Sequence, residues 1–114
     1  MRIRTLCVAV VACTASITAW GESAAPTGDA AAGQRKTAMC AGCHGIEGWR
    51  TAYPEVYGVP KIGGQHPAYI MKALQEYKSG ERGHPTMKAI AASLSEQDMA
   101  DLAAYYGGGA QAAK

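Results

Sequence analysis

The sequence predicts an all-α fold of about four helices, and three observations support this. Apolar residues recur at helical spacing over several stretches, whereas no run near Cys40 alternates as a strand would. Capping residues, Pro and Gly separate these stretches. The run Cys40-Ala41-Gly42-Cys43-His44 carries two thiols three residues apart, the spacing of one helical turn. With 114 residues, the chain is expected to form one short domain.

The N-terminal 25 residues have the features of a secretory signal peptide. Two arginines precede an apolar run at residues 6–17, which is too short to span a bilayer. Small residues favour cleavage after Ala25, with Ala19 as the alternative. A lipoprotein-type processing site at Cys13 and an uncleaved helical anchor are further alternatives. We expect no stable membrane insertion after cleavage, and a mature domain of residues 26–109.

The first helix is expected over residues 30–39. Thr27-Gly28-Asp29 offers an N-cap, and good helix formers follow. Gly33 lies inside this helix, where a glycine costs about 1 kcal/mol relative to alanine. Its presence suggests that another backbone packs there, although simple tolerance of a costly residue is the alternative.

The C-x-x-C-H run is typical of a c-type haem attachment site. Cys40 and Cys43 can each add across one vinyl group of the same porphyrin, and His44 is then placed under the iron as its proximal ligand. Gly42 and Gly45 leave room for the porphyrin edge. An export signal agrees with this, because bacterial c-type haem is attached outside the cytoplasm.

Three alternative roles for the two cysteines fit the sequence less well. A zinc site needs a second ligand pair, but the remaining cysteines, Cys7 and Cys13, lie in the predicted signal. A thioredoxin-like redox pair needs a βαβ context that is not predicted here. A disulfide between Cys40 and Cys43 would close a very short loop and leave His44 unexplained.

Residues 45–65 are rich in Gly, Pro and Tyr and have no regular period, so they predict a long loop. Loops of this length are usually functional or wrap around something. Trp49, Tyr53, Tyr57 and Val59 could cover the haem edge, with polar tips directed to the propionates. They could equally be core aromatics of a small protein.

Three more helices are expected after this loop. His66-Pro67 starts one that Ser79-Gly80 ends, because proline suits a first turn. A short helix follows, and Ser95 with Asp98 starts the last in an acidic variant of the capping box. Residues 107–109 end it, and 110–114 form a flexible tail. The apolar stripes are Ile70, Leu74 and Tyr77; Met87, Ile90, Ala91 and Leu94; and Met99, Leu102, Ala103 and Tyr106.

An iron held by His44 needs a second ligand or an open position. Met87 is the preferred ligand, because it follows a loop with two breakers that can present a side chain across the haem. Met39 adjoins Cys40 on the wrong side, and packing accounts for Met71 and Met99. Met87 could instead be core filler. His84 is the strongest rival, although a histidine before proline on a polar loop is more often solvated.

Composition and charge limit the range of functions. The chain has no Phe and many Ala and Gly, so its own apolar core would be thin and a haem would supply the missing interior. The formal charge is +2. Loss of Arg2, Arg4 and Glu22 with the signal would make it +1, and two propionates would bring it to about −1. No basic patch suggests nucleic-acid binding.

From residue 33 to residue 106 the chain resembles the class I cytochromes c, in particular the small bacterial monohaem type, which is similar to one domain of the dihaem cytochromes. The matching features are a glycine seven residues before the first cysteine, the haem motif, a P-x-I-x-G-Q segment, a G-x-R turn, a methionine and a closing helix. In sequence terms these are Gly33; Cys40 to Gly45; Pro60 to Gln65; Gly80 to Arg82; Met87; and Leu94 to Tyr105.

This resemblance implies a class I cytochrome c fold wrapped around one covalently bound haem c, with the first and last helices crossing at Gly33. It implies Met87 as the distal axial ligand. It also implies that the Pro60 carbonyl accepts the proton on the other nitrogen of His44. Two departures from the family pattern concern Thr37, where an aromatic is usual, and the longer, more aromatic segment 45–60.

The expected function is one-electron transfer in the periplasm, as a carrier rather than an enzyme, between redox partner proteins. One alternative is a cytochrome subunit docked on a dehydrogenase or oxidase, which the aromatic loop favours. The other is a small-ligand haem sensor, which requires that Met87 leave the iron free.

Overall fold

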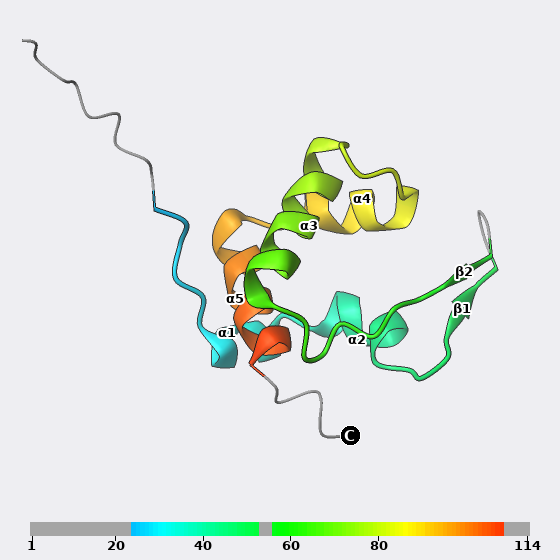
Figure 1. The fold of residues 1–114 in the computed structure, drawn as a ribbon, viewed down its shortest axis with the longest axis horizontal. Helices are drawn as coiled ribbons and strands as arrows, with labels where there is room; N and C mark the ends of the chain where they lie inside the picture. Colours follow the sequence, from blue (N-terminus) through cyan, green and yellow to red (C-terminus); the bar gives the residue numbers. More distant parts are fainter. Residues whose placement is uncertain (1–23, 53–55, 109–114) are drawn as a thin grey trace, which may run out of the picture.

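The structure, a computed structural model, describes residues 24–52 and 56–108. Within these ranges it contains five helices and one two-stranded antiparallel sheet (Figure 1). The predicted helical class is confirmed. Most of the predicted signal peptide 1–25 and all of the tail 110–114 lie outside the described residues. The elements are α1 Ala30–Arg35, α2 Ala38–His44, β1 Arg50–Thr51, β2 Tyr57–Gly58, α3 Pro67–Ser79, α4 Pro85–Ala92 and α5 Glu96–Gly107.

The first predicted helix is two helices, α1 and α2, joined by a turn. Asp29 is the N-cap of α1, and its carboxylate accepts from the amide of Ala31. The break comes at Lys36 and Thr37. The Thr37 hydroxyl donates to the carbonyl of Gln34 at 2.9 Å, and this local bond competes with continuation of the helix.

Two of the three later helices, α3 and α5, begin where the sequence predicted, whereas α4 begins two residues earlier than expected, at Pro85. Pro67 and Pro85 occupy first turns, where the missing N–H costs nothing. Ser95 and Asp98 form the reciprocal capping box at the start of α5. The α3 helix ends at Gly80, whose φ of 89° is left-handed and favours glycine.

The long segment after His44 is not wholly irregular, which corrects the prediction of a loop. Arg50 pairs with Gly58 and Thr51 with Tyr57, forming the short antiparallel β ribbon. The amide of Val59 also donates to the carbonyl of Trp49 at 2.9 Å. Two-residue strands carry too little alternation to be recognised from sequence.

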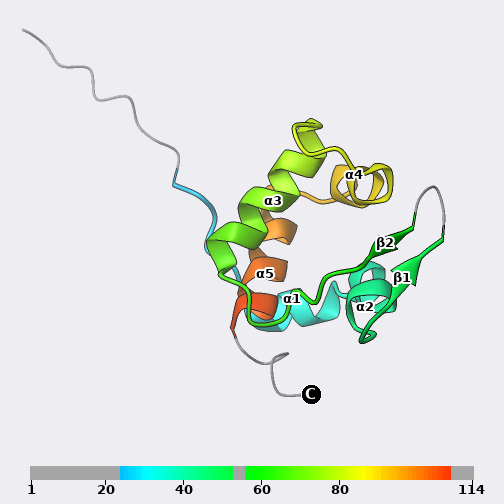
Figure 2. The ribbon, with the colours of Figure 1, turned by 45° about the vertical axis from the view of Figure 1, so that its right-hand side comes forward.

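Helices α1 and α3 both pack against α5, and α4 packs against α3 (Figure 1). The turned view shows the same arrangement of these helices (Figure 2). The central core cluster contains Ile70, Leu102, Ala103 and Tyr106. Seven hydrophobic residues are buried in the described part of the chain, and three are alanines. The protein's own core is therefore thin, as its composition predicted.

None of the helices within residues 24–52 and 56–108 has the length and apolar character needed to cross a membrane.

Candidate haem site

A cavity of about 500 Å³ lies between α2, the β ribbon, α3 and the start of α4. This volume is typical of small-molecule and cofactor sites, which span roughly 300 to 1,000 Å³. Three large side chains on its walls are substantially exposed, namely Met39, Tyr57 and Tyr69, at 54%, 40% and 49%. Exposed apolar surface gathered around one hollow indicates that another group covers it. Its other apolar walls include Val59, Ile62, Ile70, Ala73, Leu74 and Ile90.

The two cysteines of the C-x-x-C-H run lie on α2 as free thiols, and both are half-buried. Cys43 lines the cavity. Cys40 instead packs against the core cluster, with its thiol within hydrogen-bond reach of Tyr106. Burial raises the pKa of the Cys40 thiol, and the bond to Tyr106 partly offsets this rise. The structure therefore brings Cys43, but not Cys40, to the cavity wall.

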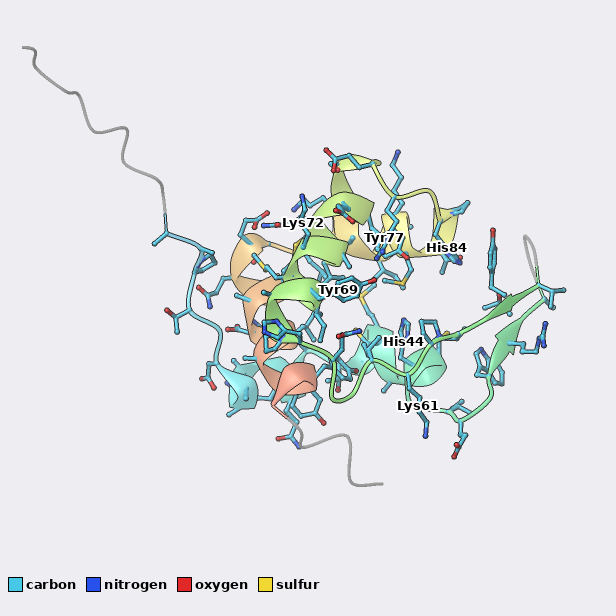
Figure 3. All side chains as sticks on the ribbon, in the orientation of Figure 1. His44, Lys61, Tyr69, Lys72, Tyr77 and His84 are labelled. Carbon is cyan, nitrogen blue, oxygen red and sulfur yellow. The ribbon has the colours of Figure 1, made fainter. Side chains whose placement is uncertain are left out.

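His44 is the last residue of α2, and its ring lies on the cavity wall. Its Nδ1 is 2.7 Å from the carbonyl oxygen of Pro60. Because a carbonyl only accepts, Nδ1 must carry the proton, and Nε2 then keeps a free electron pair. A histidine whose other nitrogen donates to a backbone carbonyl has the arrangement typical of a metal ligand. Figure 3 shows His44 across from Tyr69, Tyr77 and His84.

Met87 also lines the cavity, from the first turn of α4. The sequence placed it just after a loop, and the helix in fact begins two residues earlier, at Pro85. Met39 lines the cavity too, although its position beside Cys40 had argued against it. It lies on α2, the same short helix as His44, so it does not face that histidine from another element. Met71 packs on the core cluster, and Met99 is fully buried.

The sequence left His84 as a rival ligand of a type that is more often solvated, and the structure places it in the cavity wall. It is half-buried, lines the cavity and is the N-cap of α4, where its Nδ1 accepts from the amide of Met87 at 3.3 Å. Its ring centroid lies 4.8 Å from that of Tyr57 and 6.4 Å from that of Tyr77. The sequence signal was present, since a polar residue directly before Pro85 is an N-cap pattern.

Arg82 also lines the cavity. In the sequence it was noted only as the last residue of the G-x-R turn that resembles the family pattern. Its guanidinium lies over the rings of Tyr69 and Tyr77, 5.6 and 5.3 Å from their centroids. It also donates to the hydroxyl of Tyr69 at 3.0 Å, and this bond raises the pKa of Arg82. The side chain therefore braces two aromatic residues on one wall.

The aromatic segment before Pro60 contributes only in part to the cavity. Tyr57 and Val59 line it, as expected. Trp49 is not a lining residue and is 42% exposed. Tyr53 lies outside the described residues.

Comparison with known proteins gives the family. The family model described as Cytochrome c matches residues 30–106, from the first residue of α1 almost to the end of α5. The chain belongs to the cytochrome c family. A cytochrome c domain carries one covalently bound haem c. The apolar cavity, the free Nε2 of His44 and the thioether of Met87 from a different helix fit that group.

Individual cytochromes agree with this assignment. Cytochrome c4 of Pseudomonas aeruginosa is 43% identical over 79 residues, which cover 69% of this chain and 37% of that protein. Cytochrome c-554(548) of Halomonas halodenitrificans is 39% identical over 82 residues, covering 69% of this chain and 94% of that protein. The crystal structure of reduced recombinant cytochrome c4 from Pseudomonas stutzeri superposes with a TM-score of 0.54 at 32% identity, covering 73% of this chain and 52% of that one. This cytochrome c chain spans about two fifths of the length of its cytochrome c4 relatives.

Proposed function

We propose that this cytochrome c domain is a periplasmic one-electron carrier with His44 and Met87 as the two axial ligands of its iron. The observation that carries this is the placement of both residues on one cavity, from different helices. His44 comes from α2 and Met87 from α4. A site with both axial positions filled by side chains has no open position for a substrate, so the domain would be a carrier and not an enzyme.

The remaining roles belong to the two cysteines of α2, to Pro60 and to the Met87 thioether. Cys40 and Cys43 would hold the porphyrin through two thioether bonds. Pro60 would keep His44 in the tautomer whose Nε2 can bind iron, and would raise its basicity. The Met87 thioether would favour the reduced state and raise the potential.

The bound haem supplies one-electron chemistry at its iron. The protein contributes rigidity and exclusion of water. Apolar residues from α3 and α4, including Leu74 and Ile90, line the cavity and would exclude water around the haem. Ligands fixed on two packed helices would change little in geometry between redox states, which favours rapid transfer.

The periplasmic location rests on the sequence of residues 1–25. Two arginines, a short apolar run and small residues before position 26 support export and cleavage. The mature domain would span residues 26–109 and exchange electrons with partner proteins, without stable membrane insertion.

The direct test is spectroscopic. Haem-loaded protein made from the full chain should be reduced and reoxidised reversibly by one electron, and the reduced form should bind carbon monoxide only slowly. Ready binding of carbon monoxide would overturn the carrier assignment and favour a small-ligand sensor instead.

A second candidate is a cytochrome subunit of a dehydrogenase or oxidase complex. The observation that favours it is the exposure of three large apolar side chains beside the β ribbon: Ile46, Trp49 and Val56, at 45%, 42% and 64%. Single exposed residues are ordinary, but three in one short segment suit a protein interface. Stable co-purification with a larger redox enzyme would select this candidate, and isolation as a free monomer would select the shuttle.

A further inference from the structure

His84 is the point where three elements meet beside Met87. It stands directly before α4, its ring contacts Tyr57 of β2 and Tyr77 of α3, and it lines the cavity. Figure 3 shows its ring close to Tyr77, on the side of the cavity opposite His44. None of the roles assigned above uses this side chain.

The hydrogen bond made by His84 falls on the residue that carries the thioether. Pro85, the first residue of α4, has no N–H to satisfy. The third helical residue is Met87, and its amide donates to Nδ1 of His84 at 3.3 Å. An N-cap of this kind fixes the first turn of a helix. Here the turn that it fixes is the one from which the Met87 side chain enters the cavity.

The neighbouring side chains hold the ring of His84 in place. Tyr57 lies against it at a tilt of 52°, and Tyr77 meets it edge-on at 79°. Tyr77 is itself covered by Arg82, which is anchored to Tyr69. The cap is thereby tied to α3 and to the β ribbon as well as to α4.

We propose that His84 is a positioning residue for Met87: its N-cap bond fixes the first turn of α4 so that the thioether faces the iron. This inference rests on the proposed function, in which Met87 is the distal ligand. In this proposal Nδ1 of His84, the acceptor of the Met87 amide, fixes the turn, and the aromatic contacts hold the His84 ring in place.

The chain contains a matched control. His66 caps α3 in the same way: it precedes a proline, and its Nδ1 accepts from the amide of Ala68 at 3.3 Å. His66 is exposed and is not a lining residue of the cavity. Removing the His66 side chain therefore deletes the same kind of N-cap hydrogen bond from α3 and leaves α4, the helix that carries Met87, unchanged.

The experiment compares four variants of the haem-loaded protein: His84→Ala, His84→Asn, His84→Phe and His66→Ala. Two quantities are measured, the near-infrared sulfur-to-iron charge-transfer band of the oxidised protein and the rate at which the reduced protein binds carbon monoxide. Carbon monoxide can bind only when Met87 leaves the iron. Loss of an N-cap side chain typically shifts an equilibrium about fivefold, so His84→Ala should weaken the band and bind carbon monoxide about fivefold faster.

The other variants separate the cap from the ring. Asparagine is among the best N-cap residues, so His84→Asn should restore both readouts to within about twofold of wild type. His84→Phe keeps an aromatic ring but has no acceptor, and should behave like His84→Ala. His66→Ala should leave both readouts unchanged.

Different results would overturn the two proposals separately. If His84→Ala matches wild type, or if phenylalanine rescues and asparagine does not, the cap does not position Met87, while the distal ligand stands. If the wild-type protein lacks the band and binds carbon monoxide freely, Met87 is not the ligand, and both proposals fail.

Discussion

Gly33 of α1 lies directly against the backbone carbonyl of Asp101 in α5. A Cβ at position 33 would stand 2.1 Å from that oxygen and 2.8 Å from the Cβ of Tyr105. No rotamer change relieves a contact with backbone, so the two helices can approach this closely only because residue 33 is glycine. The hypothesis that another backbone packs at Gly33 is confirmed, as is the crossing of the first and last helices there.

Gly33→Ala should therefore lower the free energy of unfolding by about 3 kcal/mol or more, the upper part of the range for overpacking. Thermal unfolding of the haem-loaded wild type and variant measures this loss of stability. Gln34→Ala, an exposed change on the same helix, should shift the midpoint little. Equal midpoints for the two variants would show that α1 and α5 do not meet as described.

Asp101 is the one buried charged residue among those described, and it joins three segments. Its carboxylate accepts from the amide of Asp29 at 2.9 Å, from Lys36 at 2.5 Å and from Gln97 at 2.9 Å. The Asp29 amide and then the Lys36 ammonium lower the pKa of Asp101 to about 2. Lys36 also bridges to Asp98 at 2.7 Å, and this bond, with those to Ser95, lowers the pKa of Asp98 as well.

These lowered pKa values predict acid sensitivity. Between the folded and the unfolded pKa, the unfolded chain binds more protons, so stability falls as pH falls. The contribution should be complete above the unfolded value of about 4 and lost as pH drops through about 2. Asp101→Asn should lower the melting temperature at neutral pH and flatten its decline between these limits.

Glu47→Gln is the control for this acid effect. Its partner Lys61 is 3.4 Å away, but the Glu47 side chain is 87% exposed, so the pair contributes little. If Asp101→Asn and wild type lose stability in parallel on acidification, the Asp101 network is not the cause.

Local signals in the sequence were sufficient to predict most helix starts. Asp29, Pro67 and Ser95 each act on residues within one turn of themselves, so their roles can be recognised without knowing the fold. The haem motif is equally local. Met87 was proposed as the distal ligand from a combination of nearby breakers and family resemblance, and it does line the cavity.

Features that depend on distant partners were missed. The carboxylate of Asp101 meets groups 65 and 72 residues away, and nothing around it in the sequence marks it as buried. The same holds for Gly28, where a Cβ would stand 2.0 Å from the carbonyl oxygen of Ala100. The β ribbon was missed because its strands are two residues long. The Asp101 network, the close approach at Gly28 and the β ribbon all depend on tertiary packing and not on local propensity.

Covalent attachment can be tested residue by residue. Haem should stay with the wild-type protein through acid-acetone extraction, because the proposed attachment is through two thioether bonds. Cys40→Ala and Cys43→Ala should each retain haem through one bond, and the double variant should release it, as mass spectrometry would show. Met71→Ala serves as a control with both bonds intact. Extraction of haem from wild type would contradict the attachment roles given to both cysteines.

The haem-free chain should be largely disordered at room temperature. With seven buried hydrophobic residues, three of them alanine, the described core is too small to stabilise the chain alone. Binding that occurs only in the folded state adds its free energy to folding. Circular dichroism during heating should show no cooperative transition without haem and a sharp one with it. A cooperative transition in the haem-free mature chain would show that the core is sufficient.

Met87→Ala should remove the proposed distal ligand and leave the protein folded, because Met87 is only half-buried in the cavity wall. The near-infrared sulfur-to-iron band should disappear and the reduced protein should bind carbon monoxide. The potential should fall by roughly 0.1 to 0.3 V, within the ~0.8 V that axial ligands span, because a thioether that favours ferrous iron has been removed.

Met71→Ala is the matched control for this last prediction, since Met71 packs on the core cluster and does not line the cavity. It should cost about 2 kcal/mol or more of stability while keeping the band. Met39→Ala provides a second comparison, because Met39 lines the cavity from the same helix as His44. Loss of the band in either of these variants, and not in Met87→Ala, would assign the distal ligand to that methionine. One-electron transfer would then remain the function, with a different residue on the iron.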